Sequence, residues 1–532
     1  MTTDVGSDPL AAATAAVEIA ESLVASCSSA LAKGGGADED QVVAYDLAHA
    51  ASATTAARTM LDYGTRGGDE RDLTCAFVAE VMVDLAGRVA GREPEWGVEH
   101  GWSAPAADFL RSYREPGFLA GLCGKIGPTH LDDDFELVRE TFHRFAEDKV
   151  RPHAEEVHRE NLDVPEEIIV GLSELGGFGL SVPEEFGGFA SGTESDYMGM
   201  VVATEELSWG ALCIGGSLIT RPEILTRAIV KGGTDEQKRE WLPKLASGEI
   251  MAAVSVTEPD FGSDVANLVT SATRTEGGWT IRGVKTWCTF AARADVLMLL
   301  ARTDPDRSKA HRGLSMFIVE KPRADGDGFV LTQEGEGAGR LEGRPIDTLG
   351  YRGMHSYELS FEDWFVPDSG LIGGEAGIGR GFYLQMQGFE NGRLQTAARA
   401  LGVMQAAYDA AFAYASERNV FGSPIIDFQL TRVKLTRMAA TIQAIRQCAY
   451  ATARLMAKGE GALEASMVKA YGCRAAEWVT REAMQIHGGM GYAEEFAVSR
   501  YFVDARVLSI FEGADETLAL KVVARRLLDG VS

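Results

Sequence analysis

The segment from 251 to about 367 alternates apolar and polar side chains, whereas the segments on either side of it have helical spacing. Within it, TSATRTEGGWTIRG predicts two strands joined by a Gly-Gly hairpin turn, and VLMLLART, LSMFIVEK and YELSFEDWFVP predict further strands. A chain that changes period in this way cannot be a single all-helical or all-β domain. We therefore predict an antiparallel barrel or sandwich inserted between helical parts.

The same changes of period divide the rest of the chain. A chain of 532 residues is too long for one hydrophobic core. We predict an α+β multidomain fold with the following parts: a helical extension over 1–128, a helical domain over 129–250, the β domain over 251–367 and a C-terminal four-helix bundle over 368–532.

The N-terminal extension contains helical faces but no chemical motif. Val43, Leu47, Thr54 and Leu61 recur at helical spacing, as on one face of a packed helix. We expect a docking or oligomer-blocking bundle, and the alternative is an inert spacer.

The charge balance narrows the range of partners. There are 51 Lys plus Arg against 78 Asp plus Glu, so the net charge is −27. Such a surface repels phosphate backbones and anionic lipid, which argues against nucleic-acid and membrane partners. No apolar run approaches the roughly 20 residues that span a bilayer.

The cysteines and the N-terminus indicate a cytoplasmic protein. Seven scattered cysteines without a C-x-x-C pair are typical of reduced thiols. No cluster has zinc or iron–sulfur spacing, so no metal is expected. The start MTTDVGSDPL has no early Arg or Lys and therefore lacks the pattern of a signal or transit peptide.

Two segments of the β region offer groups suited to a flat heterocycle. VSVTEPDFGSD, residues 254–264, supplies backbone amides and hydroxyls in a loop that leaves a strand. Farther on, Trp287 and Thr289 are two residues apart, so they would face the same side of a strand. One would offer an aromatic wall and the other a hydrogen bond; the alternative is a core tryptophan beside a satisfied threonine.

A carboxylate near the C-terminus stands among apolar residues. In SIFEGADETLAL, Glu512 follows Ile510 and Phe511 and precedes Gly513. The simplest interpretation is a turn at Gly513, with Asp515 capping a last helix. A carboxylate in dry surroundings is also what a general base requires.

Five stretches, taken in order, resemble the acyl-CoA dehydrogenase family. The two β-region segments resemble its T-E-P-x-x-G-S-D and W-x-T flavin-binding signature. RNVFGSPIIDFQ resembles its R-x-x-F-G…Q segment, AMQIHGGMGYAEE its Q-x-x-G-G-x-G turn, and IFEGADET the E-G-T segment with the catalytic base. The resemblance covers about residues 131 to 530 and implies a helical domain, a β domain and a four-helix bundle.

The resemblance implies FAD as the cofactor and assigns residues to it. The residues expected to hold the flavin ring are Val254, Val256, Thr257, Ser263, Trp287 and Thr289. Those expected to reach the FAD of a neighbouring subunit are Arg418, Phe421 and Gln429, and the turn closing over it contains Gln485, Gly488 and Gly489. Ala514 and Glu516 also fall at FAD positions, but the family often has Thr and Gln there.

The resemblance also implies the reaction. Glu512 would remove the α-hydrogen of an acyl-CoA thioester, and a hydride would pass to the flavin. Some relatives carry the base just before the arginine of the first bundle helix, but here Gly392 precedes Arg393. Ser263, Arg393 and Gly513 are the expected substrate contacts. An electron-transfer flavoprotein would accept the electrons; the alternatives are a flavin oxidase or monooxygenase and a non-catalytic acyl-CoA-binding scaffold.

The contacts expected across a subunit boundary imply a homo-oligomer. A dimer is favoured, because the extension could cover the face on which family dimers pair into tetramers. A tetramer is the alternative.

Three features separate the chain from fatty-acyl relatives: the extension, the loop EGEGAGRLEGRP at 334–345, and the segment TWCTFAARAD. They resemble a branch of the family that oxidises (2S)-methylsuccinyl-CoA to mesaconyl-CoA in the bacterial ethylmalonyl-CoA pathway. The free carboxylate of that substrate needs a cationic partner, for which Arg221, Arg352 and His355 are candidates, with surface charges as the alternative. A monocarboxylic acyl-CoA such as isovaleryl-CoA is the second expectation.

Overall fold

The computed structural model describes residues 8–335 and 338–531, except for the side chains of Ser195, Gln387, Phe389 and Glu390. Residues 336 and 337 of the predicted loop at 334–345 lie outside the described chain. The chain divides into two compact units, one formed by Met1–Glu136 with Thr396–Ser532 and the other by Leu137–Gln395.

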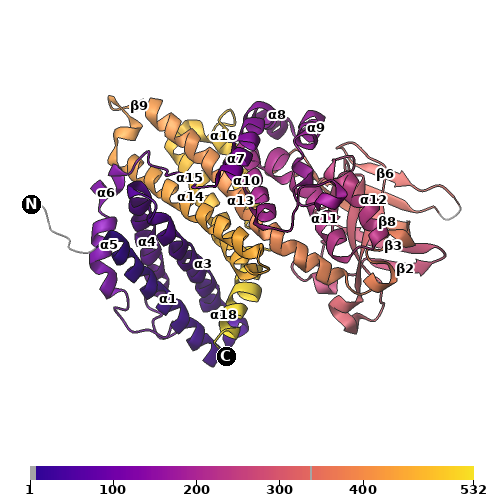
Figure 1. Cartoon of the computed structure of the whole chain (residues 1–532), viewed down its shortest axis with the longest axis horizontal. Helices are drawn as coiled ribbons and strands as arrows, with labels where there is room; N and C mark the ends of the chain where they lie inside the picture. The colour runs from indigo at the N-terminus through magenta and orange to yellow at the C-terminus, as the bar shows by residue number, and fades with distance from the viewer. Residues whose placement is uncertain (1–7, 336–337, 532) are drawn as a thin grey trace, which may run out of the picture. The chain divides into compact units, whose positions relative to one another are not determined.

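In the first unit, the extension is a helical bundle that packs on the C-terminal helices. Its helices are α1 (Pro9–Lys33), α2 (Gly36–Glu39), α3 (Gln41–Gly64), α4 (Gly68–Val89), α5 (Ala107–Tyr113) and α6 (Pro116–Gly121). Helix α3 is rich in buried alanines and contacts α1 and α4 as well as the C-terminal helices α14 and α15, so it is surrounded on several sides. Figure 1 shows these indigo helices alongside the orange ones.

Helix α1 corrects one expectation. By length and composition it is apolar enough to cross a membrane, although no such segment was expected. One face of the helix, with Val17, Leu23 and Leu31, is buried in the extension, whereas Ala11 and Ala15 are exposed.

The C-terminal region has the predicted long helices joined by short connections. The long helices are α13 (Gly381–Glu417), α14 (Gln429–Met456), α15 (Ala462–His487) and α16 (Ala497–Leu508). Two short helices, α17 (Asp515–Thr517) and α18 (Arg525–Asp529), follow them, and a two-strand hairpin of β9 (Asn419–Val420) and β10 (Ser423–Pro424) lies between α13 and α14. Helix α13 continues across the boundary of the two units.

The second unit begins with helices and continues into the sheet. The helices are α7 (Asp133–Phe145), α8 (Arg151–Glu160), α9 (Glu166–Glu174), α10 (Glu194–Gly210), α11 (Thr220–Gly232) and α12 (Asp235–Ala246). Thr234 caps α12 in a capping box with Gln237, each side chain accepting from the other's backbone N–H.

The sheet has eight strands: β1 (Ala252–Ser255), β2 (Ser271–Thr275), β3 (Gly278–Lys285), β4 (Val296–Arg302), β5 (Leu314–Glu320), β6 (Phe329–Thr332), β7 (Arg340–Ile346) and β8 (Ser356–Pro367). Their order is β1-β4-β2-β3-β8-β7-β6, with β5 also paired to β4. The β2–β3 hairpin is confirmed. Most pairs are antiparallel as expected, but β1 and β2 each pair with β4 in parallel.

Helices α11 and α12 share a core with one end of this sheet. Ile224 and Leu242 belong to the same buried cluster as Met298 and Ile318 of β4 and β5. This core fixes β1, and with it the start of the loop that carries the predicted flavin contacts.

Candidate active site

The predicted flavin loop begins at the end of β1 and is anchored by a buried ion pair. Val254 lies on β1, Val256 is buried, and Thr257 O accepts a hydrogen bond from Thr286 N. Lys285 Nζ, on β3, donates to Val256 O and to Glu258 Oε1, both at 2.9 Å.

The Glu258 carboxylate is nearly inaccessible, with 2% of the residue exposed, and also accepts from Val269 N and Thr270 N. Burial opposes its ionisation, but Lys285 and the two backbone donors hold the pKa of Glu258 below its usual range. The loop is therefore held from inside while Ser263 at its far end is exposed. Sequence reasoning missed this Lys285–Glu258 ion pair, although Glu258 lies in the segment 254–264 and Lys285 directly precedes the segment TWCTFAARAD.

The expected placement of Trp287 and Thr289 on one strand is wrong. Strand β3 ends at Lys285, and Trp287 has a left-handed backbone with φ of +58° that no strand ladder accepts. Thr289 Oγ1 is instead 2.9 Å from Ser356 Oγ at the start of β8. The core-tryptophan alternative is also wrong, because Trp287 is 56% exposed and offers an open aromatic face.

The candidate base lies in the other unit, in a loop between α16 and α17. We call residues 509–514 the base loop. Glu512 has φ of +56° and Gly513 has φ of +98°, so the chain turns sharply through two left-handed residues. The side chain of Glu512 is 11% exposed.

Two buried cationic side chains contact the base loop. Arg399 Nη2 of α13 lies 3.3 Å from Glu512 Oε1, and the side chain of Arg399 is fully buried. Lys469 Nζ of α15 donates to Gly513 O at 2.5 Å, and burial lowers the pKa of Lys469. Arg399 also lies over the Phe511 ring, at 4.9 Å from its centroid. Sequence reasoning missed this guanidinium, which orients the carboxylate.

A cavity of about 410 Å³ opens beside the base loop. Its lining includes Ala514 and Glu516, the two positions at which the sequence departs from the family, and also Arg474 and Arg506. Three carboxylates, those of Glu477, Asp515 and Glu516, line the same cavity, and Arg506 lies 3.5 Å from Glu477, so the cavity has no excess of positive charge.

The remaining predicted cofactor residues of this unit lie on exposed turns. Arg418 ends the long helix, Phe421 and Gly422 form a two-residue hairpin turn with both φ values positive, and Gln429 begins α14. Phe421 is 96% exposed at the tip. An aromatic ring so displayed is expected to be covered by a ligand or another protein surface.

The turn after α15 is open in the same way. Gln485, Gly488 and Gly489 are exposed, and Gly488 has φ of +60°. A side chain at either glycine would meet nothing within 4 Å, so the backbone there is accessible to a ligand.

The three candidates for holding a substrate carboxylate differ in their surroundings. Arg352 donates to His158 O and Thr348 O, and His355 Nε2 lies 3.1 Å from Asp163 Oδ1. Arg221 is buried and donates to Ser217 O and Thr220 Oγ1, and it forms an ion pair with none of the described side chains. Arg393, on α13 in the same unit, is partly buried.

Family models match most of the chain. The C-terminal, N-terminal and middle domains of acyl-CoA dehydrogenase match residues 379–528, 132–249 and 253–364 respectively. The chain belongs to the acyl-CoA dehydrogenase family. It is therefore an FAD-dependent oxidoreductase that acts on an acyl-CoA, and the fold class predicted from the sequence is confirmed.

Individual relatives agree with this assignment. The chain is 46% identical over 406 residues to (2S)-methylsuccinyl-CoA dehydrogenase of Cereibacter sphaeroides, a match that covers 76% of this chain and 71% of the relative. It is 33% identical to mitochondrial isovaleryl-CoA dehydrogenase of Solanum tuberosum, over 79% of this chain and 95% of the relative.

Solved structures agree as well. Butyryl-CoA dehydrogenase of Megasphaera elsdenii superposes with a TM-score of 0.66 at 30% identity, over 75% of this chain and 99% of that one. A chain in a structure of the electron transferring flavoprotein of Acidaminococcus fermentans superposes with a TM-score of 0.65 at 29% identity, over 75% of this chain and 99% of that chain.

The residues present fit an FAD in this acyl-CoA dehydrogenase. In one unit the anchored loop and Trp287 offer backbone groups and an exposed ring; in the other, the exposed turn with Gly488 and Gly489 offers an accessible backbone for phosphates. Among residues 8–335 and 338–531, no group of three or more His, Cys, Asp or Glu side chains is placed to hold a metal ion.

Proposed function

We propose that this acyl-CoA dehydrogenase oxidises (2S)-methylsuccinyl-CoA to mesaconyl-CoA, with Glu512 as the catalytic base. The choice of substrate rests on the difference in sequence identity between relatives. The chain is 46% identical to a (2S)-methylsuccinyl-CoA dehydrogenase, but 33% identical to an isovaleryl-CoA dehydrogenase and 35% identical to a short-chain acyl-CoA dehydrogenase. The three sequence features that set the chain apart favour the same substrate.

Glu512 takes the α-proton of the thioester in this proposal. Arg399 keeps the carboxylate in one orientation, and Lys469 holds the backbone directly behind it. A base fixed in this way needs no rearrangement before the proton moves. A backbone N–H at Glu512 would hydrogen-bond the thioester oxygen as its negative charge grows, with Gly513 beside it. FAD, when bound, supplies the acceptor for the hydride from the β-carbon.

Two sets of residues of this chain would hold the cofactor. Val254, Val256, Thr257, Ser263, Trp287 and Thr289 would contact the flavin ring, and Arg418, Phe421, Gln429, Gln485, Gly488, Gly489, Ala514 and Glu516 the rest of FAD. Ser263 and Arg393 would also contact the substrate.

The free carboxylate of the substrate would pair with Arg221. A buried guanidinium without a counter-ion is costly, so an anionic ligand is favoured beside it. Arg352 and His355 are less suitable, because the backbone carbonyls and Asp163 already engage them.

We further propose a cytoplasmic homodimer that passes its electrons to an electron-transfer flavoprotein. The similarity to a chain from an electron-transferring flavoprotein structure supports that partner. Several large apolar side chains of the first unit, Phe421, Leu430, Tyr492 and Ile510, are more than half exposed, which supports an interface between copies.

A substrate panel tests the choice of acyl group. (2S)-Methylsuccinyl-, isovaleryl- and butyryl-CoA are compared for kcat/KM under identical conditions with an artificial electron acceptor. We expect (2S)-methylsuccinyl-CoA to be preferred; faster turnover of isovaleryl- or butyryl-CoA would overturn this choice. Arg221→Lys should raise the KM for the dicarboxylic substrate alone, since only that substrate carries the second carboxylate.

A further inference from the structure

The backbone of the base loop adopts an unfavourable conformation at Glu512. Glu512 is a non-glycine residue in the left-handed region, and Gly513 follows it there. Strained residues of this kind persist only where neighbouring groups fix them. The contacts that hold the loop therefore decide where the Glu512 carboxylate points.

One of these contacts comes from the extension and not from the bundle. Tyr45 Oη of α3 donates to Asp515 Oδ2 at 2.5 Å, directly after the base loop. His49 Nε2, one turn farther along α3, lies 3.3 Å from the same oxygen without hydrogen-bond geometry. Asp515 N in turn donates to Ser509 O, which closes the loop from its first residue to the residue after its last.

The Asp515 side chain is an ionised acceptor at this position. Burial opposes its charge, but the contacts with His49 and Tyr45 hold the pKa of Asp515 below its usual range. A hydrogen bond to a charged acceptor is stronger than a neutral one.

Helix α3 is itself firmly docked beside the segment that follows the loop. Ala48 and Ala51 belong to one buried cluster with Ala519 and Val523. Nearby, Asp38 pairs with Lys521 at 2.6 Å and with Arg525 at 2.8 Å. Tyr45 therefore contacts Asp515 from a helix whose position is fixed by packing and by nearby ion pairs.

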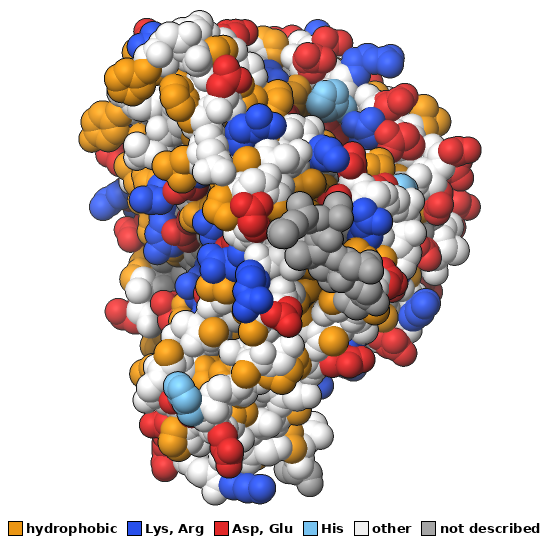
Figure 2. Space-filling model, turned by 90° about the vertical axis from the view of Figure 1, so that its left-hand side faces the viewer, with side chains coloured by type: hydrophobic (Ala, Val, Ile, Leu, Met, Phe, Trp, Pro, Cys, Tyr) orange, Lys and Arg blue, Asp and Glu red, His pale blue; other side chains and the backbone are white. Residues whose placement is uncertain are grey.

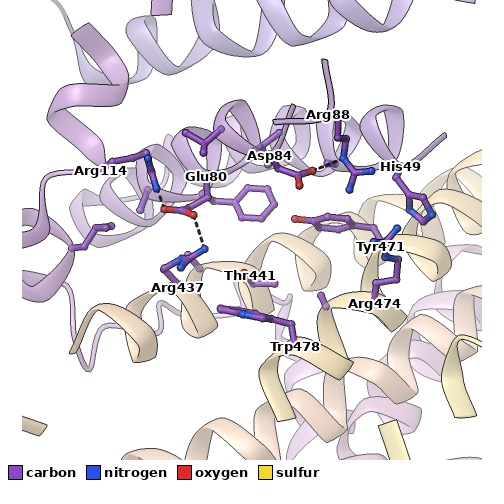
Figure 3. Close-up of a pocket in the computed structure, with 18 residues that line it drawn as sticks. His49, Glu80, Asp84, Arg88, Arg114, Arg437, Thr441, Tyr471, Arg474 and Trp478 are labelled. Carbon is purple, nitrogen blue, oxygen red and sulfur yellow. Dashed lines mark hydrogen bonds and ion pairs between the residues drawn. The ribbon is translucent and has the colours of Figure 1, made fainter. Parts of the chain in front are cut away.

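Two cavities lie near this contact. Figure 3 shows a cavity of about 530 Å³ between α4 on one side and α14 and α15 on the other, with His49 at its edge. Across it, Glu80 of α4 links to Arg437 of α14 at 2.8 Å. Tyr45 lines the smaller cavity beside the base loop. Arg474, which lines both cavities, donates to Tyr45 Oη at 3.2 Å, so the tyrosine hydroxyl links Arg474 to Asp515.

We propose that the extension is a working part of the active site, in which Tyr45, assisted by His49, positions Glu512 by fixing Asp515. The inference rests on the proposed role of Glu512 as the base. The residues that do this precede residue 132, where the family models begin. Tyr45 is a positioning residue and contacts neither substrate nor the reacting atoms.

The test compares two tyrosines of the same helix. Tyr45→Phe removes only the hydroxyl, which donates to Asp515 and accepts from Arg474 Nη1 at 3.2 Å. Tyr63→Phe is the matched control, because Tyr63 Oη donates to Pro128 O at 3.1 Å, outside the base loop. For each holoenzyme, flavin reduction by saturating (2S)-methylsuccinyl-CoA is followed in an anaerobic single turnover, together with FAD content and substrate Kd.

We expect Tyr45→Phe to slow flavin reduction by about tenfold, with FAD content and Kd unchanged and a larger isotope effect from α-deuterated substrate, since a misaligned base affects proton removal. Tyr63→Phe should reduce its flavin at the wild-type rate. Asp515→Ala should slow the reaction similarly, and the double variant Tyr45→Phe/Asp515→Ala should be no slower than the slower single variant.

Two results would overturn the positioning role of Tyr45. One is a rate of flavin reduction in Tyr45→Phe equal to that in Tyr63→Phe, and the other is loss of FAD as the only defect of Tyr45→Phe. Glu512→Gln separates the two proposals. If that variant is inactive while Tyr45→Phe is normal, only the positioning role fails, whereas normal flavin reduction in Glu512→Gln would refute the base assignment itself.

Discussion

Lys285→Met should destabilise the unit formed by Leu137–Gln395 and weaken FAD binding. The ammonium is fully buried and has two partners, Val256 O and Glu258 Oε1, each at 2.9 Å. Methionine fills similar volume but leaves the Glu258 carboxylate buried with only its two backbone donors. Breaking one half of a buried ion pair in this way costs about 3–5 kcal/mol.

The expected change is measurable by thermal unfolding of the apoprotein and by FAD titration. At about 2–4 °C per kcal/mol for a unit of this size, Tm should fall by roughly 6–20 °C. FAD affinity should fall as well, because Val256 belongs to the loop assigned to the flavin. The double variant Lys285→Met/Glu258→Gln should regain part of the stability, since it removes the unpaired charge.

Arg282→Met is the matched control on the same strand. Arg282 pairs with Asp363, but both side chains are largely exposed, at 68% and 43%, so solvent screens the pair and little stability should be lost. If Lys285→Met lowers Tm no more than Arg282→Met does, the buried Lys285–Glu258 ion pair does not stabilise the flavin loop and this prediction is refuted.

Two further predictions concern assembly and pH. Phe421→Ser should weaken FAD retention and shift light scattering toward monomer, because Phe421 is 96% exposed in a single chain; a flavin-loaded wild-type monomer would contradict the proposed dimer. His143 donates to Glu206 at 2.6 Å, which raises the pKa of His143, so the pair stabilises the fold below the unfolded value of about 6.5 and this contribution is lost as pH rises through the folded pKa. The stability difference between wild type and His143→Gln should therefore shrink from about pH 6 to about pH 8.5, and a difference that grows would contradict this sign.

The order of domains could be predicted from the sequence because periodicity reports which face of each element is buried. The base loop could be located because its shape depends on neighbours in sequence, a glutamate followed by a glycine. Its surroundings could not: Arg399 and Lys469 come from helices remote in sequence, and Tyr45 is 470 positions from Asp515. Such contacts depend on tertiary packing, for which one sequence carries no local signal.

Two errors of interpretation have the same origin. The period of two around Trp287 predicted a strand, but the chain leaves the ladder through a left-handed residue that periodicity does not register. Helices α3 and α4 contact α1 and cover one apolar face of it. Figure 2 shows acidic and basic side chains interspersed on one face of the molecule. The net charge of −27 therefore does not form one acidic patch there.

The most direct test of the central claim is anaerobic flavin reduction by (2S)-methylsuccinyl-CoA in wild type and Glu512→Gln, compared at equal FAD content and saturating substrate. The amide keeps the size of the side chain but cannot accept a proton, so reduction should slow by about 10²–10⁴-fold or more while FAD and substrate still bind. Flavin bleaching in Glu512→Gln at a rate near that of wild type would contradict the assignment of Glu512 as the base.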